Sequence, residues 1–454
     1  MRLSSLAYSA TICTFAGQIA NAAITLDIED PESIKQAAGR AAWDMMQYYT
    51  GNETGDVPGN LPDPYFWWEC GAMFGSLINY WYYTGDTTYN ANVEQGMLHQ
   101  AGPEFDFMPI NQSKTLGNDD QGFWGLAAMT AAETGFPDPP TGPGWLALAQ
   151  AVYNTQVPRW DPSCGGGLRW QIFPFNTGFN YKNSISNGCY FALAARLALY
   201  TGNTTYADEA IKTWNWMWDI NLIKHDTYWI VDGAHNTDNC TEMDGNTWTY
   251  NSGVFLLGAA AMYNHTNGST IWRERVDGLI GAGKKFFIND VLHEGCEPAG
   301  TCNVDQRSFK AYYSRWLAAT AKLVPYTHDN ITREFKASAV AAASTCSGGS
   351  TGTACGLRWT EGPVHDGSVG VGEQMAVMEI IQSNLVDAAP AWKSEVLGTG
   401  TSKGDVNAGT GLTDGDHLTG VKRVTNADRV GAGILTALVL LGVIGGSTTM
   451  LLSD

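Results

Sequence analysis

Apolar positions recur at helical spacing along most of the chain and divide it into separate segments. Apolar residues at i, i+3, i+4 and i+7 are typical of a helix that buries one face. Helix-start and helix-stop signals delimit these segments. The predicted helices cover residues 31–49, 69–83, 88–100, 119–133, 143–156, 184–200, 205–221, 248–263, 270–287, 307–324, 330–345 and 368–385.

The segments alternate in character along the chain. The odd-numbered ones carry charge on one face, as in ESIKQAAGRAAWDMMQYY (32–49). The even-numbered ones are apolar and rich in small residues almost all round, as in NGCYFALAARLALY (187–200). A helix with a polar face belongs at the surface, and a helix that is apolar all round is buried. The pattern therefore predicts an all-α fold, an (α/α)6 barrel of six inner and six outer helices.

A short repeat supports this division into helical hairpins. YTGDTTY (83–89) returns as YTGNTTY (200–206), and in each case a helix end is followed by a glycine and a threonine-led restart. Glycine is favoured just after the last helical residue because it adopts the left-handed conformation without strain. Both copies are predicted to be turns between an inner helix and the next outer helix.

Both ends of the chain have the pattern of processing signals. Residues 1–22 are mostly apolar and end in Ala-Asn-Ala, which is typical of a signal peptide. Residues 398–433 are rich in Gly, Ser, Thr and Asp and precede an apolar tail, 434–454, which together resemble a GPI-attachment signal. A single membrane span is the alternative, since a bilayer needs ~17 to 25 apolar residues. The absence of a basic flank after the tail favours GPI and leaves 23–397 as the domain that forms the predicted barrel.

Cysteines and glycosylation motifs fit an exported protein. Removal of the signal peptide leaves eight cysteines, an even number that permits up to four disulfides. Cys296 with Cys302, and Cys346 with Cys355, are close enough for local loop closure, although the sequence leaves the pairing open. Seven Asn-x-Ser/Thr motifs fit the same compartment. We expect a secreted monomer held at the outer face of the plasma membrane or in the cell wall.

Charge and composition narrow the choice of ligand. The net charge of −19, without a cluster of lysine or arginine, argues against nucleic acid as a partner. The 17 tryptophans and 19 tyrosines provide rings that can stack on the C–H faces of sugars while their polar atoms bind hydroxyls. The composition therefore favours a carbohydrate ligand.

No metal or cofactor is expected. The histidines and cysteines form no HExxH or CxxC pair, which argues against zinc. The acidic loop DGAHNTDNCTEMDGN (232–246) lacks EF-hand spacing, so we expect a loop that lines a cleft or faces solvent. GGSTG (348–352) matches the nucleophile-elbow pattern but lies in a turn between two cysteines.

The starts of the six inner helices share a polar and aromatic chemistry that the rest of these helices lacks. Because the inner helices of such a barrel run in one direction, their starts should converge on one mouth. That mouth would be aromatic, amide-rich and acidic, as a carbohydrate cleft requires. The six starts are residues 65–70, 117–121, 183–188, 247–252, 305–310 and 365–368.

Asp119 and Asp120 lie side by side at one of these starts. One interpretation is structural: the two acids lie in the first turn of a helix whose N-cap is Asn118, and Gln121 completes a capping box. As a working pair, consecutive carboxyl groups can reach the ~5 to 5.5 Å separation of retaining glycosidases. Their repulsion, about 3 kcal/mol at an effective dielectric of ~20, exceeds the ~1 kcal/mol of the helix dipole. We therefore expect one acid to be ionised while the other holds a proton.

Four motifs of the chain resemble glycoside hydrolase family 76, the α-1,6-mannanases, and more narrowly its fungal GPI-anchored branch of the defective-cell-wall and defective-filamentous-growth type. The motifs are DPYFWWECGAMFGSLINYWYYTGD (63–86), GNDDQGFWGLAA (117–128), YNSG (250–253) and SFKAYYSRWL (308–317). The resemblance implies an (α/α)6 barrel that retains configuration, with Asp119 as nucleophile and Asp120 as acid/base.

For the fungal branch, the resemblance further implies cleavage within the mannose of a GPI glycan and transfer of the mannoprotein to wall glucan. The donor would then be a mannose-containing glycan and the acceptor wall glucan. Hydrolysis of α-1,6-mannan is one alternative. A surface protein that binds mannan without turnover is another.

Further side chains near the predicted mouth are candidates for sugar contacts. Each has an alternative structural role: the tryptophans as core, the asparagines as caps, and the two basic residues as an exposed salt bridge. The candidates are Asp63, Tyr65, Trp67, Trp68, Asn118, Gln121, Trp124, Asn183, Asn187, Asp232, His235, Tyr250, Asn251, Arg307 and Lys310.

Overall fold

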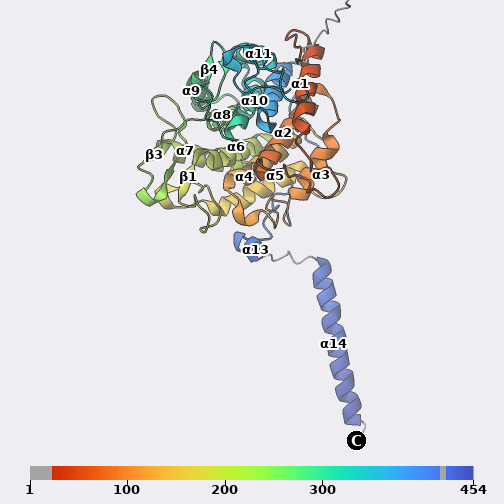
Figure 1. Cartoon of the computed structure of the whole chain (residues 1–454). Helices are drawn as coiled ribbons and strands as arrows, with labels where there is room; N and C mark the ends of the chain where they lie inside the picture. Colours follow the sequence, from red (N-terminus) through yellow and green to blue (C-terminus); the bar gives the residue numbers. More distant parts are fainter. Residues whose placement is uncertain (1–22, 420–425, 453–454) are drawn as a thin grey trace, which may run out of the picture.

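The computed structural model describes residues 23–419 and 426–452 (Figure 1), so the predicted signal peptide lies outside the described residues. Each of the twelve predicted segments forms a helix. The helices are α1 (Pro31–Met46), α2 (Trp67–Thr84), α3 (Asn90–Gln100), α4 (Asn118–Thr134), α5 (Trp145–Gln156), α6 (Ser184–Thr201), α7 (Thr204–Asp219), α8 (Thr249–His265), α9 (Thr270–Gly283), α10 (Phe309–Leu323), α11 (His328–Ser344) and α12 (Val371–Gln382).

The even-numbered helices form a closed inner ring. Each of them packs on the next, and α12 packs on α2 to complete the circle. The odd-numbered helices cover the outside, with α3 on α2, α5 on α4, α7 on α6, α9 on α8, α11 on α10 and α12, and α1 on α12. The predicted (α/α)6 barrel is therefore confirmed.

Small residues allow the inner helices to approach one another closely. A Cβ atom at Gly71 of α2 would lie 2.5 Å from the ring of Trp124 on α4, so only glycine fits there. Trp124 is fully buried as a result. At the other end of these helices, Gly85 and Gly202 end α2 and α6 with φ of 77° and 74°, which confirms the two repeated turns.

A small antiparallel sheet lies at the start of α6. It consists of β1 (Tyr181–Asn183), β2 (Gly233–His235) and β3 (Met243–Asp244), with Tyr181 opposite His235 and Asn183 opposite Gly233. A second hairpin joins β4 (Phe287–Ile288) to β5 (Val291–Leu292). The first sheet brings residues near position 232 beside the N-terminal end of α6.

Three disulfides form among the eight cysteines of the predicted mature chain. Cys296–Cys302 and Cys346–Cys355 are the two local closures expected from the sequence. Cys164 pairs with Cys240 across 76 residues. Cys70 and Cys189 are free and buried in the inner helices, so the sequence's upper limit of four disulfides is not reached.

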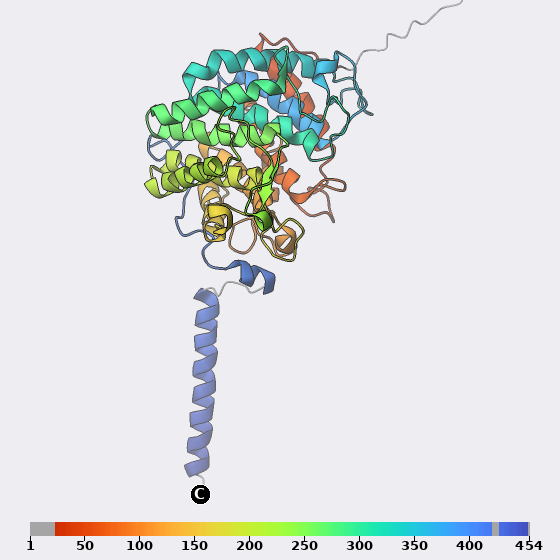
Figure 2. The same cartoon turned by 90° about the vertical axis from the view of Figure 1, so that its left-hand side faces the viewer.

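The chain after the barrel has two parts. Residues 402–419, here called the strap, lie along α5 and end in the short helix α13 (Asp414–Thr419). The strap falls within the region assigned to the spacer, and it is packed. Beyond it, α14 (Asn426–Leu452) stands away from the barrel (Figure 2). Within the described chain, one stretch, Asn426–Ile444, is long and apolar enough to cross a membrane.

Candidate active site

The starts of five inner helices surround a cleft of about 190 Å³. They belong to α2, α4, α6, α8 and α10, and residues from β1 and two loops complete its walls. The cleft is acidic and aromatic, in agreement with the chemistry expected of the barrel mouth. Its lining residues are Trp68, Asp119, Asp120, Phe123, Trp170, Tyr181, Asn183, Ile185, Asp232, Tyr250, Asp305 and Phe309.

Asp120 caps the helix on which it lies. The N-cap of α4 is Gly117, whose backbone N–H donates to Oδ2 of Asp120 at 2.7 Å. This hydrogen bond makes Asp120 the acidic partner of the capping box, a role that the sequence had suggested for Gln121, with Asn118 as the cap. That prediction is wrong by one residue at the cap. One oxygen of Asp120 is thus fixed by the backbone, which orients the carboxyl group.

Asp119 is held from the neighbouring inner helix. Asn183 Nδ2 donates to Asp119 Oδ2 at 3.0 Å, and the Asp120 backbone N–H donates to Asp119 Oδ1 at 3.0 Å. Asn183 is itself the N-cap of α6, since its Oδ1 accepts from Ser186 N at 3.3 Å. The cap of one inner helix therefore orients the acid at the start of another.

The two aspartates cannot both ionise without cost. Burial and the negative charge of Asp120 raise the pKa of Asp119, while the hydrogen bond from Asn183 acts in the opposite direction. Burial also raises the pKa of Asp120, partly offset by the Gly117 N–H and reinforced by the charge of Asp305. Titration of such a pair belongs to the pair as a whole. Burial and mutual repulsion therefore favour a proton shared by the two carboxyl groups over two neighbouring negative charges.

Two further carboxyl groups face the same cleft. Burial raises the pKa of Asp305 to about 6, against the hydrogen bond of the Trp68 side chain, which lowers it. Burial also raises the pKa of Asp232, whose Oδ2 accepts from the Tyr181 hydroxyl at 2.8 Å. Among the described residues that line the cleft, none is lysine, arginine or histidine. The site therefore suits a neutral, hydroxyl-rich ligand rather than an anion.

Aromatic side chains form the walls on either side of the acids. Trp68 packs on Phe123 with ring centroids 4.7 Å apart. Tyr250 stacks on Phe309 at 3.8 Å and an interplanar angle of 7°. The aromatic rings can pack on the apolar C–H faces of a sugar ring, while the carboxyl groups can bind the hydroxyls along its edge.

Four of the predicted sugar contacts line the cleft with the aspartate pair: Trp68, Asn183, Asp232 and Tyr250. Four others, from α2, α4 and the segment before α2, do not line it. Trp67 stacks on Trp124 and donates to Gln100, so both indoles belong to the core. The Tyr65 hydroxyl accepts from Val371 N at 3.1 Å, and Asp63 is exposed outside the cleft.

Four of the predicted asparagine and glutamine contacts do not line the cleft but form hydrogen bonds next to it. Asn118 and Gln121 both accept hydrogen bonds from Arg159, which lies outside the cleft. Asn187 is fully buried and binds the backbone of Leu168 through both ends of its amide. Asn251 donates to Asp232 Oδ1 at 3.4 Å. These side chains position others instead of lining the cleft.

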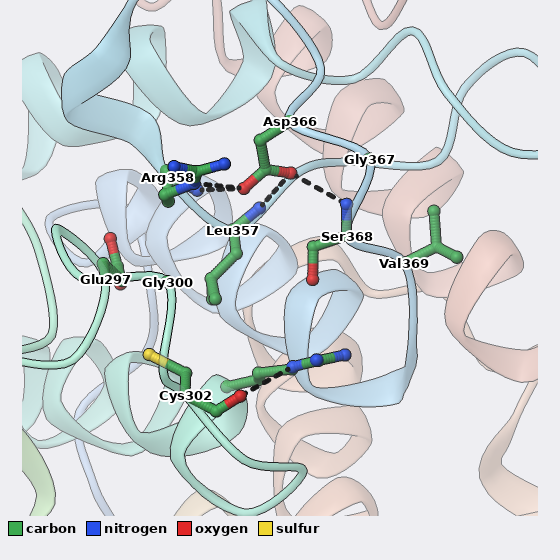
Figure 3. Close-up of a pocket in the computed structure, with 10 residues that line it drawn as sticks. Glu297, Gly300, Cys302, Leu357, Arg358, Asp366, Gly367, Ser368 and Val369 are labelled. Carbon is green, nitrogen blue, oxygen red and sulfur yellow. Dashed lines mark hydrogen bonds and ion pairs between the residues drawn. The ribbon is translucent and has the colours of Figure 1, made fainter.

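The predicted cationic contacts lie elsewhere. Arg307 lines a separate pocket of about 340 Å³ (Figure 3), where Asp366 turns toward Arg358 and accepts from its backbone N–H. Lys310 is fully buried and pairs with Glu297 at 2.9 Å. His235 is exposed, with its ring beside Tyr181 and outside the cleft lining.

Sequence reasoning missed half of the cleft lining. Asp305 lies at a recognised helix start and could have been chosen by its position. Trp170 comes from a loop whose carbonyl accepts from Asn118 N at 2.8 Å, and periodicity gives no sign of that contact. The cleft residues that were not predicted are Phe123, Trp170, Tyr181, Ile185, Asp305 and Phe309. The described residues contain no group of three or more His, Cys, Asp or Glu side chains that could hold a metal ion.

Comparison with known proteins places this site in a family. The profile of glycosyl hydrolase family 76 matches residues 33–395. The chain is 46% identical to mannan endo-1,6-alpha-mannosidase DCW1 of Saccharomyces cerevisiae, with 95% of each chain covered. It is 41% identical to mannan endo-1,6-alpha-mannosidase DFG5 of Candida albicans, over 94% of this chain and 95% of that one.

Solved structures agree in fold. Dfg5 from Chaetomium thermophilum, crystallised with glucosamine, has a TM-score of 0.81 and 45% identity over 84% of this chain and 97% of its own. An inactive variant of an alpha-1,6-mannanase of Salegentibacter, in complex with alpha-1,6-mannotriose, has a TM-score of 0.62 and 16% identity over 78% and 99%. With a matching profile over most of its length and relatives above 40% identity, the chain belongs to glycosyl hydrolase family 76.

Proposed function

We propose that this enzyme is a retaining glycosidase or transglycosidase that acts on α-mannosides, with Asp119 as nucleophile and Asp120 as general acid/base. The observation that carries the proposal is the pair itself. Two consecutive carboxyl groups lie at the start of α4, in a cleft on which the starts of five inner helices converge. Consecutive positions allow the short carboxyl separation that double displacement needs.

The reaction then has two steps. Asp119 attacks the anomeric carbon, the glycosidic bond breaks, and Asp120 gives its proton to the departing oxygen. A water molecule or a sugar hydroxyl then attacks the same carbon, gives its proton to Asp120, and releases Asp119 from the glycosyl ester. The hydrogen bond from Asn183 stabilises the Asp119 carboxylate before attack and after release.

The proposed donor contains α-1,6-linked mannose. Relatives that share more than 40% of their residues with the chain are named mannan endo-1,6-alpha-mannosidases. The Salegentibacter mannanase variant was captured with an alpha-1,6-mannotriose, and it is inactive with two consecutive aspartates changed to asparagine. The acidic, cation-free lining of the cleft suits an uncharged glycan of this kind.

In the cell, we propose that the donor is the GPI-glycan mannose of a mannoprotein and that wall glucan is the acceptor. The resemblance to the fungal wall branch supports this assignment. So does the apolar helix α14, whose length and composition fit an anchor signal at the outer face of the plasma membrane. Hydrolysis of α-1,6-mannan is the alternative, and it differs only in the molecule that attacks in the second step.

Product analysis separates transfer from hydrolysis. We expect the enzyme, given an α-1,6-mannooligosaccharide and a fluorescently labelled glucan oligosaccharide, to produce labelled species heavier by whole mannosyl units, detected by mass spectrometry. Mannan fragments alone, unchanged by the acceptor, would identify a hydrolase. Binding of the mannooligosaccharide without any product would identify a non-catalytic mannan-binding protein.

The hydrogen bond to Asp119 should set the acidic limit of activity. Asn183→Ser removes the N–H donor but keeps an oxygen that can cap α6. Loss of this donor destabilises the ionised form of Asp119, so the pKa of Asp119 rises further. At a given pH, a larger fraction of the enzyme then has Asp119 protonated. We expect the acidic limb of kcat/KM against pH to move upward by about one unit. An unmoved limb with an unchanged melting temperature would remove Asn183 from this role.

A further inference from the structure

We propose that the strap, residues 402–419, positions the two aspartates of the active site through Asp414 and Arg159. The strap is the last packed part of the chain before α14, and it lies on the outer side of α5. The proposal rests on the proposed function, because Asp119 and Asp120 are taken as the catalytic pair. It adds Arg159 and Asp414 as positioning residues, since neither lines the cleft.

Arg159 is anchored by the strap on one side. Its Nε donates to both oxygens of Asp414, at 3.1 and 3.0 Å, and its Nη2 donates to Oδ1 at 2.6 Å. The Arg159 side chain is 6% exposed and that of Asp414 is 35% exposed. This is a forked guanidinium–carboxylate contact with one partner buried, the geometry in which such pairs are strongest and most directional.

On its other side, Arg159 holds the first turn of α4. Its Nη1 donates to Asn118 Oδ1 at 3.0 Å and to Gln121 Oε1 at 2.6 Å. These two residues flank Asp119 and Asp120 in the sequence. One guanidinium therefore connects the strap to both neighbours of the aspartate pair, and the pair is held between them.

A second contact from the strap reaches the same turn. His417 Nε2 lies 3.3 Å from Asp106 Oδ2, and both side chains are buried. The backbone oxygen of Asp106 accepts from Gln121 Nε2 at 2.7 Å. His417 thus lies against the segment whose backbone binds Gln121, and Arg159 supplies the hydrogen-bonded connection from α13 to the same residue.

The physical consequence is control of the aspartate positions. A displacement of about 1 Å in a catalytic group can cost about 10²-fold in rate. Without the carboxylate of Asp414, the buried guanidinium loses its ionic partner and is free to turn from Asn118 and Gln121 toward water. The first turn of α4 then loses the support that fixes Asp119 and Asp120 relative to each other.

The test is Asp414→Asn in the full chain, with Asn154→Ala as the matched control. Asn154 on α5 donates to the strap carbonyls of Val406 and Ala408, at 3.0 and 2.8 Å, and does not touch Arg159. We expect Asp414→Asn to lower kcat on an α-1,6-mannooligosaccharide about ten- to a hundredfold with KM little changed, and Asp414→Glu to restore part of the rate. Both Asp414→Asn and Asn154→Ala should lower the melting temperature, by similar amounts, because each removes a contact between the strap and the barrel. Asn154→Ala should leave kcat unchanged.

Hydrogen exchange supplies a readout that does not depend on activity. Asp414→Asn should speed amide exchange in a peptide covering residues 116–123, whereas Asn154→Ala should not. If the unaltered enzyme turns over no mannoside, the proposed function fails while the exchange result still decides the role of the strap. Unchanged exchange with unchanged kcat would overturn the proposal. So would equal losses of kcat in Asp414→Asn and Asn154→Ala, because the strap would then act only through general stability.

Discussion

Asp119→Asn and Asp120→Asn are each expected to lower the turnover of an α-1,6-mannoside by about 10³- to 10⁴-fold. An amide at position 119 cannot attack the anomeric carbon to form the glycosyl ester. An amide at position 120 has no proton to give to the departing oxygen. Steady-state assay of purified enzyme with a mannooligosaccharide checks both variants.

The same variants should unfold at the same temperature as the unaltered enzyme, or slightly higher. Asparagine at position 120 can still accept from the Gly117 N–H, which preserves the cap of α4. Each substitution also removes one of two neighbouring carboxyl groups whose pKa values are raised by burial, so it relieves a site in which both acids are costly to ionise. Asp208→Asn, an exposed change on α7, is the control and should alter neither rate nor melting temperature. Retained activity in both cleft variants would exclude the pair from catalysis.

Azide can tell the two roles apart. In Asp119→Gly, azide can enter from the side of the missing nucleophile and should give a β-mannosyl azide from an activated α-mannoside. In Asp120→Gly, azide should instead attack the glycosyl ester from the opposite side and give the α-mannosyl azide. NMR of the isolated azides reads the configuration. The reverse result would exchange the roles of Asp119 and Asp120.

Lys310→Met should cost about 3 to 5 kcal/mol of unfolding free energy. Lys310 is fully buried, pairs with Glu297 at 2.9 Å, and donates to the Leu357 carbonyl at 2.6 Å. Its ammonium also lies 3.5 Å from the ring centroid of Trp359. Methionine fills most of the volume but leaves the carboxylate of Glu297 buried without its partner, which is the costly outcome for a buried ion pair.

Urea unfolding measures this effect, with Lys212→Met as the control. Lys212 is 41% exposed and pairs with Glu209 one helical turn away, so its loss should cost less than about 1 kcal/mol. Adding Glu297→Gln to Lys310→Met should recover part of the lost stability. If Lys310→Met instead raised KM without loss of stability, the result would support the role of Lys310 as a substrate contact that the sequence suggested.

The barrel could be predicted because its signal is repeated and local. Each inner helix is apolar around its whole circumference and each outer helix along one stripe, so the alternation shows in every window of the sequence. Closure of the ring needs only that each helix pack on its neighbours. The error at the cap of α4 is also local, since the N-cap is Gly117 and not Asn118. The side chain of Asn118 instead accepts from Arg159, and its backbone N–H donates to the Trp170 carbonyl.

The site was harder to predict because half of the residues that line it come together from segments far apart in the sequence. Asp119 and Asp120 could be found from their place at a helix start. Tyr181 and Asp232 meet only because β1 pairs with β2, across about fifty residues, and short strands leave little periodic signal. For Lys310, the sequence shows a charge at a helix start, but burial beside Glu297 depends on a loop closed by a disulfide.

The packed strap has a consequence for where the enzyme can work. It ends at Thr419 and α14 begins at Asn426, so at ~3.5 Å per residue the connecting chain reaches at most about 25 Å. If α14 is a membrane span, or is replaced by a lipid as we propose, this short connection would hold the barrel close to the bilayer. Glycans carried on the same membrane would then be within its reach at high local concentration, whereas more distant polymers would have to extend toward the membrane to meet it.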